Sequence, residues 1–120
     1  PATIADLDTH RLVTFGHPVP LWLRELNSLE SLGRPDGEPR ASALQINDLL
    51  AIERAVQRGI GIAILPDYMV SPTSGLEQLL PDLEMPSYDV YFCYPEAMKN
   101  QAKLRAFRDF LFTKARSWAF

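Results

Sequence analysis

Few side chains in this sequence have the spacing that catalysis or metal binding requires. The chain has two histidines, His10 and His17, and one cysteine, Cys93. The histidines follow no ligand spacing such as H-x-x-x-H, and Cys93 lies in an aromatic stretch where inert burial is expected. Asp6 and Asp8 are close in sequence, but acidic side chains at the start of a helix commonly interact with the positive end of the helix dipole. We therefore expect no catalytic residue, no metal and no cofactor, and we expect the protein not to be an enzyme.

Nucleotide-binding and hydrolase motifs are also missing. The sequence has no G-x-S-x-G elbow, no P-loop and no dinucleotide-binding glycine pattern. The glycines of GIGIA (59–63) precede an aliphatic run, whereas those of a phosphate loop follow a strand. The net charge is −3, which argues against a nucleic-acid-binding surface, because phosphate contacts need clustered Lys and Arg.

Two polar stretches are better candidates for binding a small molecule. One is Phe15-Gly16-His17-Pro18, after an apolar run, and the other is Gln45-Ile46-Asn47-Asp48, before an amphipathic helix. In a parallel α/β sheet, ligands collect beyond the carboxyl ends of the strands, where both stretches are expected. Asn47 is the expected N-cap, and the free N–H groups after it would attract an anionic ligand. The alternative is that Asn47 only caps its helix.

Two large aromatic residues flank the Gly-His-Pro sequence. Phe15 precedes it and Trp22 follows it, so the pair could form an apolar wall for a small molecule. The alternative is that Trp22 is the core anchor of its helix, and the sequence supports the two readings equally.

These residues would be positioned by alternating strands and helices. Thr3 can cap a short first helix. Apolar periodicity and turn residues predict the strands 11–15, 42–46, 60–65 and 88–94, and the helices 20–32, 47–58 and 98–118. This order predicts an α/β fold with a mainly parallel sheet and flanking helices.

The join between the helix at 47–58 and the next strand is the most informative stretch. Gly59 is expected to end the helix in a left-handed conformation. The aliphatic run 60–65 predicts a central strand covered on both faces, with Gly61 allowing helix and strand to approach closely. Pro66 would end the strand and begin a short helical turn.

The last predicted helix carries a large apolar face, formed by Leu104, Phe107, Phe110, Leu111 and Trp118. A patch of that size needs a cover in a soluble protein. Folding back onto the chain, packing against another copy and exchange of the helix between copies would each supply one. We expect association between copies, because the apolar strand at 88–94 would otherwise leave an open edge.

Three motifs together resemble LysR-type transcriptional regulators. They are P-x-T-x-x-D-L-x-x-H at 1–10, N-D-L-L-A-I-x-x-A-V-x-x-G-I-G-I-A-I-L-P at 47–66, and Y-P-x-x-x-K followed by F-R-D-F-L at 94–111. The middle motif is the most specific. The match covers nearly the whole chain and corresponds to the C-terminal part of the family's effector-binding domain.

The resemblance implies a fold like that of type-2 periplasmic binding proteins, in which two α/β subdomains enclose an effector. Residues 1–87 are similar to the second subdomain, and 88–120 to the strand and helix that return to the first. The family's DNA-binding helix-turn-helix is not found in this sequence, which reads as a fragment. DNA contact is therefore expected only through a domain outside it. The family's effector positions fall on Phe15, Gly16, His17, Trp22, Gln45 and Asn47.

The expected function is effector sensing for a cytoplasmic regulator, with a small-molecule effector and other copies of the chain as partners. One cysteine excludes an internal disulfide and fits a reducing compartment, and no signal peptide or membrane-spanning run is found. A solute-binding protein or an enzyme on the same fold is the alternative, and a purely oligomerising module is a third. A helix-turn-helix upstream of Pro1 would decide between them.

Overall fold

The computed structural model describes residues 1–34 and 37–117. The chain divides into two compact units, Pro1–Met85 and Pro86–Phe120, and each is described by itself. In the first unit the elements are η1 (Ala5–Thr9), β1 (Val13–Thr14), η2 (Leu21–Glu30), β2 (Leu44–Gln45), α1 (Leu49–Gln57) and η3 (Asp67–Met69), where η denotes a 3₁₀ helix. The second contains η4 (Glu96–Met98) and α2 (Ala102–Ala115).

The sheet of the first unit is small and parallel, with β1 at its centre. β1 pairs with β2 in the register Val13 to Leu44 and Thr14 to Gln45. On its other side, Leu12 forms a parallel bridge with Ile62. The expected parallel arrangement of the first three extended segments is therefore confirmed. The expected central place of 60–65 is wrong, because this segment lies beside β1 and forms a single bridge.

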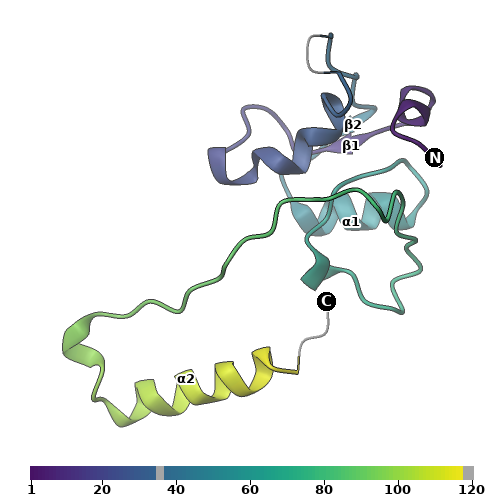
Figure 1. The fold of residues 1–120 in the computed structure, drawn as a ribbon. Helices are drawn as coiled ribbons and strands as arrows, with labels where there is room; N and C mark the ends of the chain where they lie inside the picture. The colour runs from purple at the N-terminus through teal and green to yellow at the C-terminus, as the bar shows by residue number, and fades with distance from the viewer. Residues whose placement is uncertain (35–36, 118–120) are drawn as a thin grey trace. The chain divides into compact units, whose positions relative to one another are not determined.

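Both faces of β1 are covered by helices. Leu12 packs with Leu7 of η1 and Leu29 of η2, whereas Val13 packs with Ile52 of α1. Successive side chains of a strand point to opposite faces, so these two groups lie on opposite sides of the sheet. Figure 1 shows β1 and β2 side by side with α1 beneath them. The mixed α/β architecture of the sequence prediction is confirmed at this level.

The segment after α1 also contributes to both faces. Ile62 and Ile64 pack against the η1–η2 side, whereas Ala63 and Leu65 pack against the α1 side. Its expected cover on two faces is confirmed.

Gly59 and Gly61 have different roles in this join. Gly59 has a φ of 70° directly after α1, which confirms the left-handed helix end. A Cβ on Gly61 would lie 2.4 Å from the carbonyl oxygen of Arg11. The expectation that Gly61 accommodates the helix is therefore wrong, because its close neighbour is the backbone leading into β1. Pro66 begins η3, as predicted.

The first two helices differ from expectation in detail. Thr3 does not cap η1; instead, the carboxylate of Asp6 accepts hydrogen bonds from the N–H groups of Ala2 and Thr3 at 2.8 and 2.9 Å. η2 is a 3₁₀ helix that follows Pro20. Its buried side chains include Leu29, but Trp22 is 76 % exposed. Trp22 is therefore not a core anchor.

The second unit departs most from the sequence prediction. Residues 88–94 form no strand, although their aromatic and apolar composition suggested one. A strand needs a hydrogen-bonding neighbour, and none is found for this stretch in the described residues. Cys93 is exposed, which contradicts its expected burial. The last helix is confirmed over α2, where Phe107 and Phe110 are more than half exposed. Trp118 lies outside the described residues.

None of the helices in the described parts of the chain is long and apolar enough to cross a membrane.

Candidate functional site

The two candidate loops meet at Gly16 and Asn47. Gly16 is buried, and a Cβ added to it would lie 2.0 Å from Oδ1 of Asn47. The Asn47 side chain therefore lies directly against the backbone of the loop after β1. Asn47 itself is exposed, so its amide is available to a bound molecule.

Asn47 is not the cap of α1, which corrects the sequence prediction by one residue. The N-cap is Asp48, whose Oδ1 accepts a hydrogen bond from the N–H of Ala51 at 2.8 Å. Asn and Asp are both good caps, and α1 starts at Leu49, so the adjacent Asp48 takes that position. Within the described residues, no hydrogen bond engages the Asn47 amide.

A buried asparagine on η2 holds the loop after β1. The amide of Asn27 accepts a hydrogen bond from the N–H of Phe15 at 2.8 Å and donates one to its carbonyl oxygen at 2.9 Å. The Phe15 side chain packs against the core on the α1 side. No ring contact joins Phe15 to the exposed Trp22 among the described side chains, so the structure does not assemble the two into one wall.

A polar cluster lies beside the same loop. Nε2 of His17 is 3.4 Å from Oε2 of Glu30, the last residue of η2. The other carboxylate oxygen, Oε1, accepts a hydrogen bond from the Ser42 hydroxyl at 2.8 Å. The hydroxyl of buried Thr14 lies 2.7 Å from Ser42 Oγ and 3.2 Å from Glu30 Oε1. The β1 end, η2 and the segment before β2 are thereby joined.

The remaining predicted residue, Gln45, is the last residue of β2. It is exposed and is paired in register with Thr14. Gln45 therefore marks the carboxyl end of β2, next to the end of β1. The structure thus groups Gly16, His17, Gln45 and Asn47 at one edge of the sheet, and leaves Trp22 exposed on η2.

Sequence reasoning missed the residues that support this edge. Asn27 offered a signal, because it is a polar residue between Leu26 and Leu29 on the apolar face of its helix, and a buried polar group usually has a structural partner. Ser42 and Glu30 offered none, because their contact depends on how β2 and η2 pack.

Charged side chains connect the C-terminal end of η2 to η1. Arg40 is 9 % exposed and donates hydrogen bonds to the carbonyl oxygens of Leu29 and Leu32 at 3.0 and 2.7 Å. It also pairs with Asp8 of η1 at 2.6 Å, and Arg34 pairs with the other oxygen of Asp8 at 2.8 Å. Hydrogen bonds from Arg34 and then Arg40 lower the pKa of the Asp8 carboxyl. In the described ranges, no three His, Cys, Asp or Glu side chains gather into a metal site.

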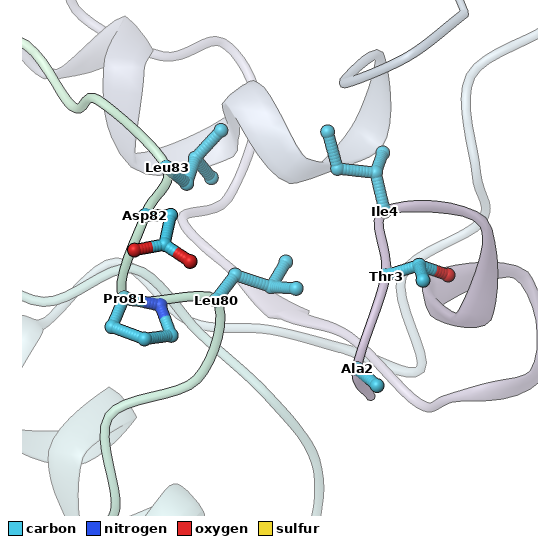
Figure 2. A pocket seen from close by; sticks show the side chains of 7 residues that line it. All are labelled: Ala2, Thr3, Ile4, Leu80, Pro81, Asp82 and Leu83. Carbon is cyan, nitrogen blue, oxygen red and sulfur yellow. The ribbon is translucent and has the colours of Figure 1, made fainter.

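A separate pocket lies between the N-terminus and the loop after residue 79. It is lined by Ala2–Ile4 and Leu80–Leu83, and Figure 2 shows Leu80 pointing across it towards Thr3 and Ile4. Its volume of ≈ 260 Å³ is just below the range of about 300–1,000 Å³ for typical small-molecule sites. It contains none of the predicted site residues.

Comparison with known proteins gives one family and one relative. A family profile described as the LysR substrate binding domain matches residues 1–116. The chain is 34 % identical over 67 residues to the HTH-type transcriptional regulator PtxR of Pseudomonas aeruginosa. The matched stretch covers 53 % of this chain and 22 % of PtxR, so the chain spans well under two thirds of that relative's length. No solved structure matches.

Proposed function

The chain belongs to the LysR substrate-binding domain family, the effector-binding part of LysR-type regulators, and we propose that its effector binds at the ends of β1 and β2. The family is non-enzymatic, so the expected chemistry is recognition of a small molecule. The proposed site consists of Phe15, Gly16, His17, Gln45 and Asn47, with Trp22 contributing from η2.

The contact between Gly16 and Asn47 is the observation that supports this site. It joins the ends of two neighbouring parallel strands, where α/β sheets bind ligands. Because Asp48 caps α1, the Asn47 amide can donate and accept hydrogen bonds elsewhere. Asn27 holds the backbone of Phe15 through two hydrogen bonds, so one loop of the site is preorganised.

We propose that Trp22 contributes an exposed apolar contact to this site. Its side chain is 76 % exposed and lies at the start of η2. An exposed indole can bury a large apolar area when a ligand or a second subdomain covers it.

We further propose how this chain acts within the whole regulator. Effector occupancy would control DNA binding by a helix-turn-helix domain outside the residues of this chain, in a cytoplasmic homo-oligomer. Residues 1–87 would form the second effector subdomain, and 88–120 would return to the first. The division of the chain after Met85 supports this assignment.

Substitution of Gly16 tests the proposed site. Wild-type protein is screened against a library of small metabolites by thermal shift, and the affinity of each hit is measured by calorimetry. Gly16→Ala must displace the Asn47 side chain, because the new Cβ would overlap its Oδ1. Loss of about one hydrogen bond should weaken binding roughly 2- to 10-fold.

Gly37→Ala is the matched control. A Cβ at Gly37 makes only ordinary contacts with Arg34, so affinity should be unchanged. If hits bind wild type and Gly16→Ala equally well, the effector does not use this loop and the proposed site is wrong.

A further inference from the structure

Among the described residues, hydrogen bonds from hydroxyl groups hold the Glu30 carboxylate at one of its two oxygens. Its side chain is 15 % exposed. Oε1 accepts a hydrogen bond from Ser42 and lies within reach of the Thr14 hydroxyl. The Ser42 hydroxyl, which itself lies 2.7 Å from the Thr14 hydroxyl, holds Oε1, and the second oxygen, Oε2, faces His17 in the loop after β1.

The second oxygen has a weak partner. Oε2 faces Nε2 of His17 at 3.4 Å, which is longer than the 2.7–3.2 Å of an ordinary N–H···O hydrogen bond. The His17 side chain is 55 % exposed and can rotate away into solvent. A mostly buried carboxylate with so loose a partner is suited to accept a stronger donor, because charge-assisted hydrogen bonds are short and strong.

The charges at the site favour a positive donor. The positive end of the α1 dipole is already met by the Asp48 carboxylate, which caps the helix. Glu30 adds a second carboxylate beside the loop, and His17 is the basic side chain that contacts it. An anionic effector was expected because neutral Asn47 was predicted to cap α1 and leave the positive helix end to the ligand. The cap is instead the Asp48 carboxylate, whose negative charge disfavours an anion there.

We propose that the effector carries an amine, amidine or guanidine group that replaces His17 on Oε2 of Glu30. This inference rests on the effector site proposed above and adds the chemical class of its ligand. Glu30 is the residue that selects the charge of the ligand, and Thr14 and Ser42 are positioning residues that orient it.

Methylguanidinium and acetate are the probes that test the ligand class. Each is titrated at constant ionic strength into the isotope-labelled chain, and backbone amide signals of Gly16 and His17 are followed by NMR. Methylguanidinium should shift both signals saturably, whereas acetate should not. Glu30→Gln removes the charge and should weaken methylguanidinium binding about tenfold or more. Glu25→Gln, on the same helix but paired with Arg24, should leave binding unchanged.

A second variant keeps the inference testable if Glu30→Gln does not fold. His17→Ala removes the side chain that the cation would displace from Glu30, so methylguanidinium should bind more tightly than to wild type. Saturable shifts of the loop signals by acetate, with none by methylguanidinium, would overturn the cationic class but leave the proposed site in place. Equal binding to wild type and folded Glu30→Gln would overturn the role of Glu30. Absence of loop shifts with both probes would also overturn the inference. The location of the effector site is tested separately, by the calorimetry of Gly16→Ala.

Discussion

Adjacent residues with similar chemistry have different roles at the start of α1. Asn47 and Asp48 can both cap a helix, and only the structure shows that Asp48 does so. The consequence is functional, because capping occupies the Asp48 carboxylate and leaves the Asn47 amide against Gly16, free for a ligand.

Truncation of the two residues should therefore affect stability and binding differently. Asp48→Ala removes the hydrogen bond to the N–H of Ala51 and should lower the free energy of unfolding by about 1 kcal/mol. Asn47→Ala should change it by less than about 0.5 kcal/mol. Urea denaturation measures both, with Asp48→Ser as the control that retains a cap. A larger loss for Asn47→Ala than for Asp48→Ala would show that the cap is misassigned.

The ion pairs of Asp8 should make stability depend on acid pH. Hydrogen bonds from Arg34 and Arg40 lower the pKa of Asp8, so the folded state binds this proton less readily than the unfolded state. The stabilisation is present above the ordinary pKa of about 3.9 and is lost as the pH falls through the lowered folded value.

Asp8→Asn should thus destabilise the protein at neutral pH, and its difference from wild type should shrink below about pH 4. Urea midpoints measured across this range test the prediction, with Asp82→Asn as a control on the exposed surface. A difference that stays constant at all pH values would mean that the ion pairs contribute nothing to folding.

Among the helices and strands, the features that depend only on residues close in sequence were predicted correctly. The end of α1 at Gly59, the turn after Pro66 and the last helix follow from capping and periodicity, and the structure has them. The predicted strand at 88–94 was wrong because its aromatic composition reflects only β-propensity, whereas a strand also needs a hydrogen-bonded neighbour.

The same limit applies to the candidate site. The loops after β1 and before α1 were found because strand ends and helix starts are local features. Glu30 and Ser42 were missed because residues far apart in sequence meet only through tertiary packing.

The two glycines after α1 should respond differently to alanine. Gly61→Ala places a Cβ 2.4 Å from the Arg11 carbonyl oxygen, and backbone cannot yield as a flexible side chain can. We expect Gly61→Ala to lower the free energy of unfolding by about 1–3 kcal/mol. The Leu12–Ile62 bridge should be lost in this variant.

A Cβ at Gly59 would contact no other atom, but the backbone there is left-handed. Gly59→Ala should therefore lower the free energy of unfolding by about 1–2 kcal/mol without disturbing the sheet. Amide hydrogen exchange of Val13 and Ile62 separates the two effects, because both donate across the bridge. Equal protection in both variants would show that Gly61 is not required by the neighbouring strand.

At the scale of the whole molecule, the aromatic side chains of the second unit need a cover. Phe107, Phe110 and Phe112 are each more than half exposed on α2. We expect copies of the chain to associate through this helix, because apolar patches of several hundred Å² rarely stay exposed in a soluble monomer.

Light scattering across a concentration series measures this association. Phe110→Glu should shift the distribution towards monomer, whereas Lys103→Glu, at an exposed polar position of α2, should not. A monomer at every concentration, in wild type and variants alike, would contradict the prediction.

We propose that the effector binds where the ends of β1 and β2 meet, and a map of backbone amide shifts on adding a small molecule identified in the thermal-shift screen tests this location. The shifts should concentrate at Phe15–His17 and Gln45–Leu49, with little change at the pocket of Ala2–Ile4 and Leu80–Leu83. Shifts confined to that pocket, with both loops unchanged, would contradict it.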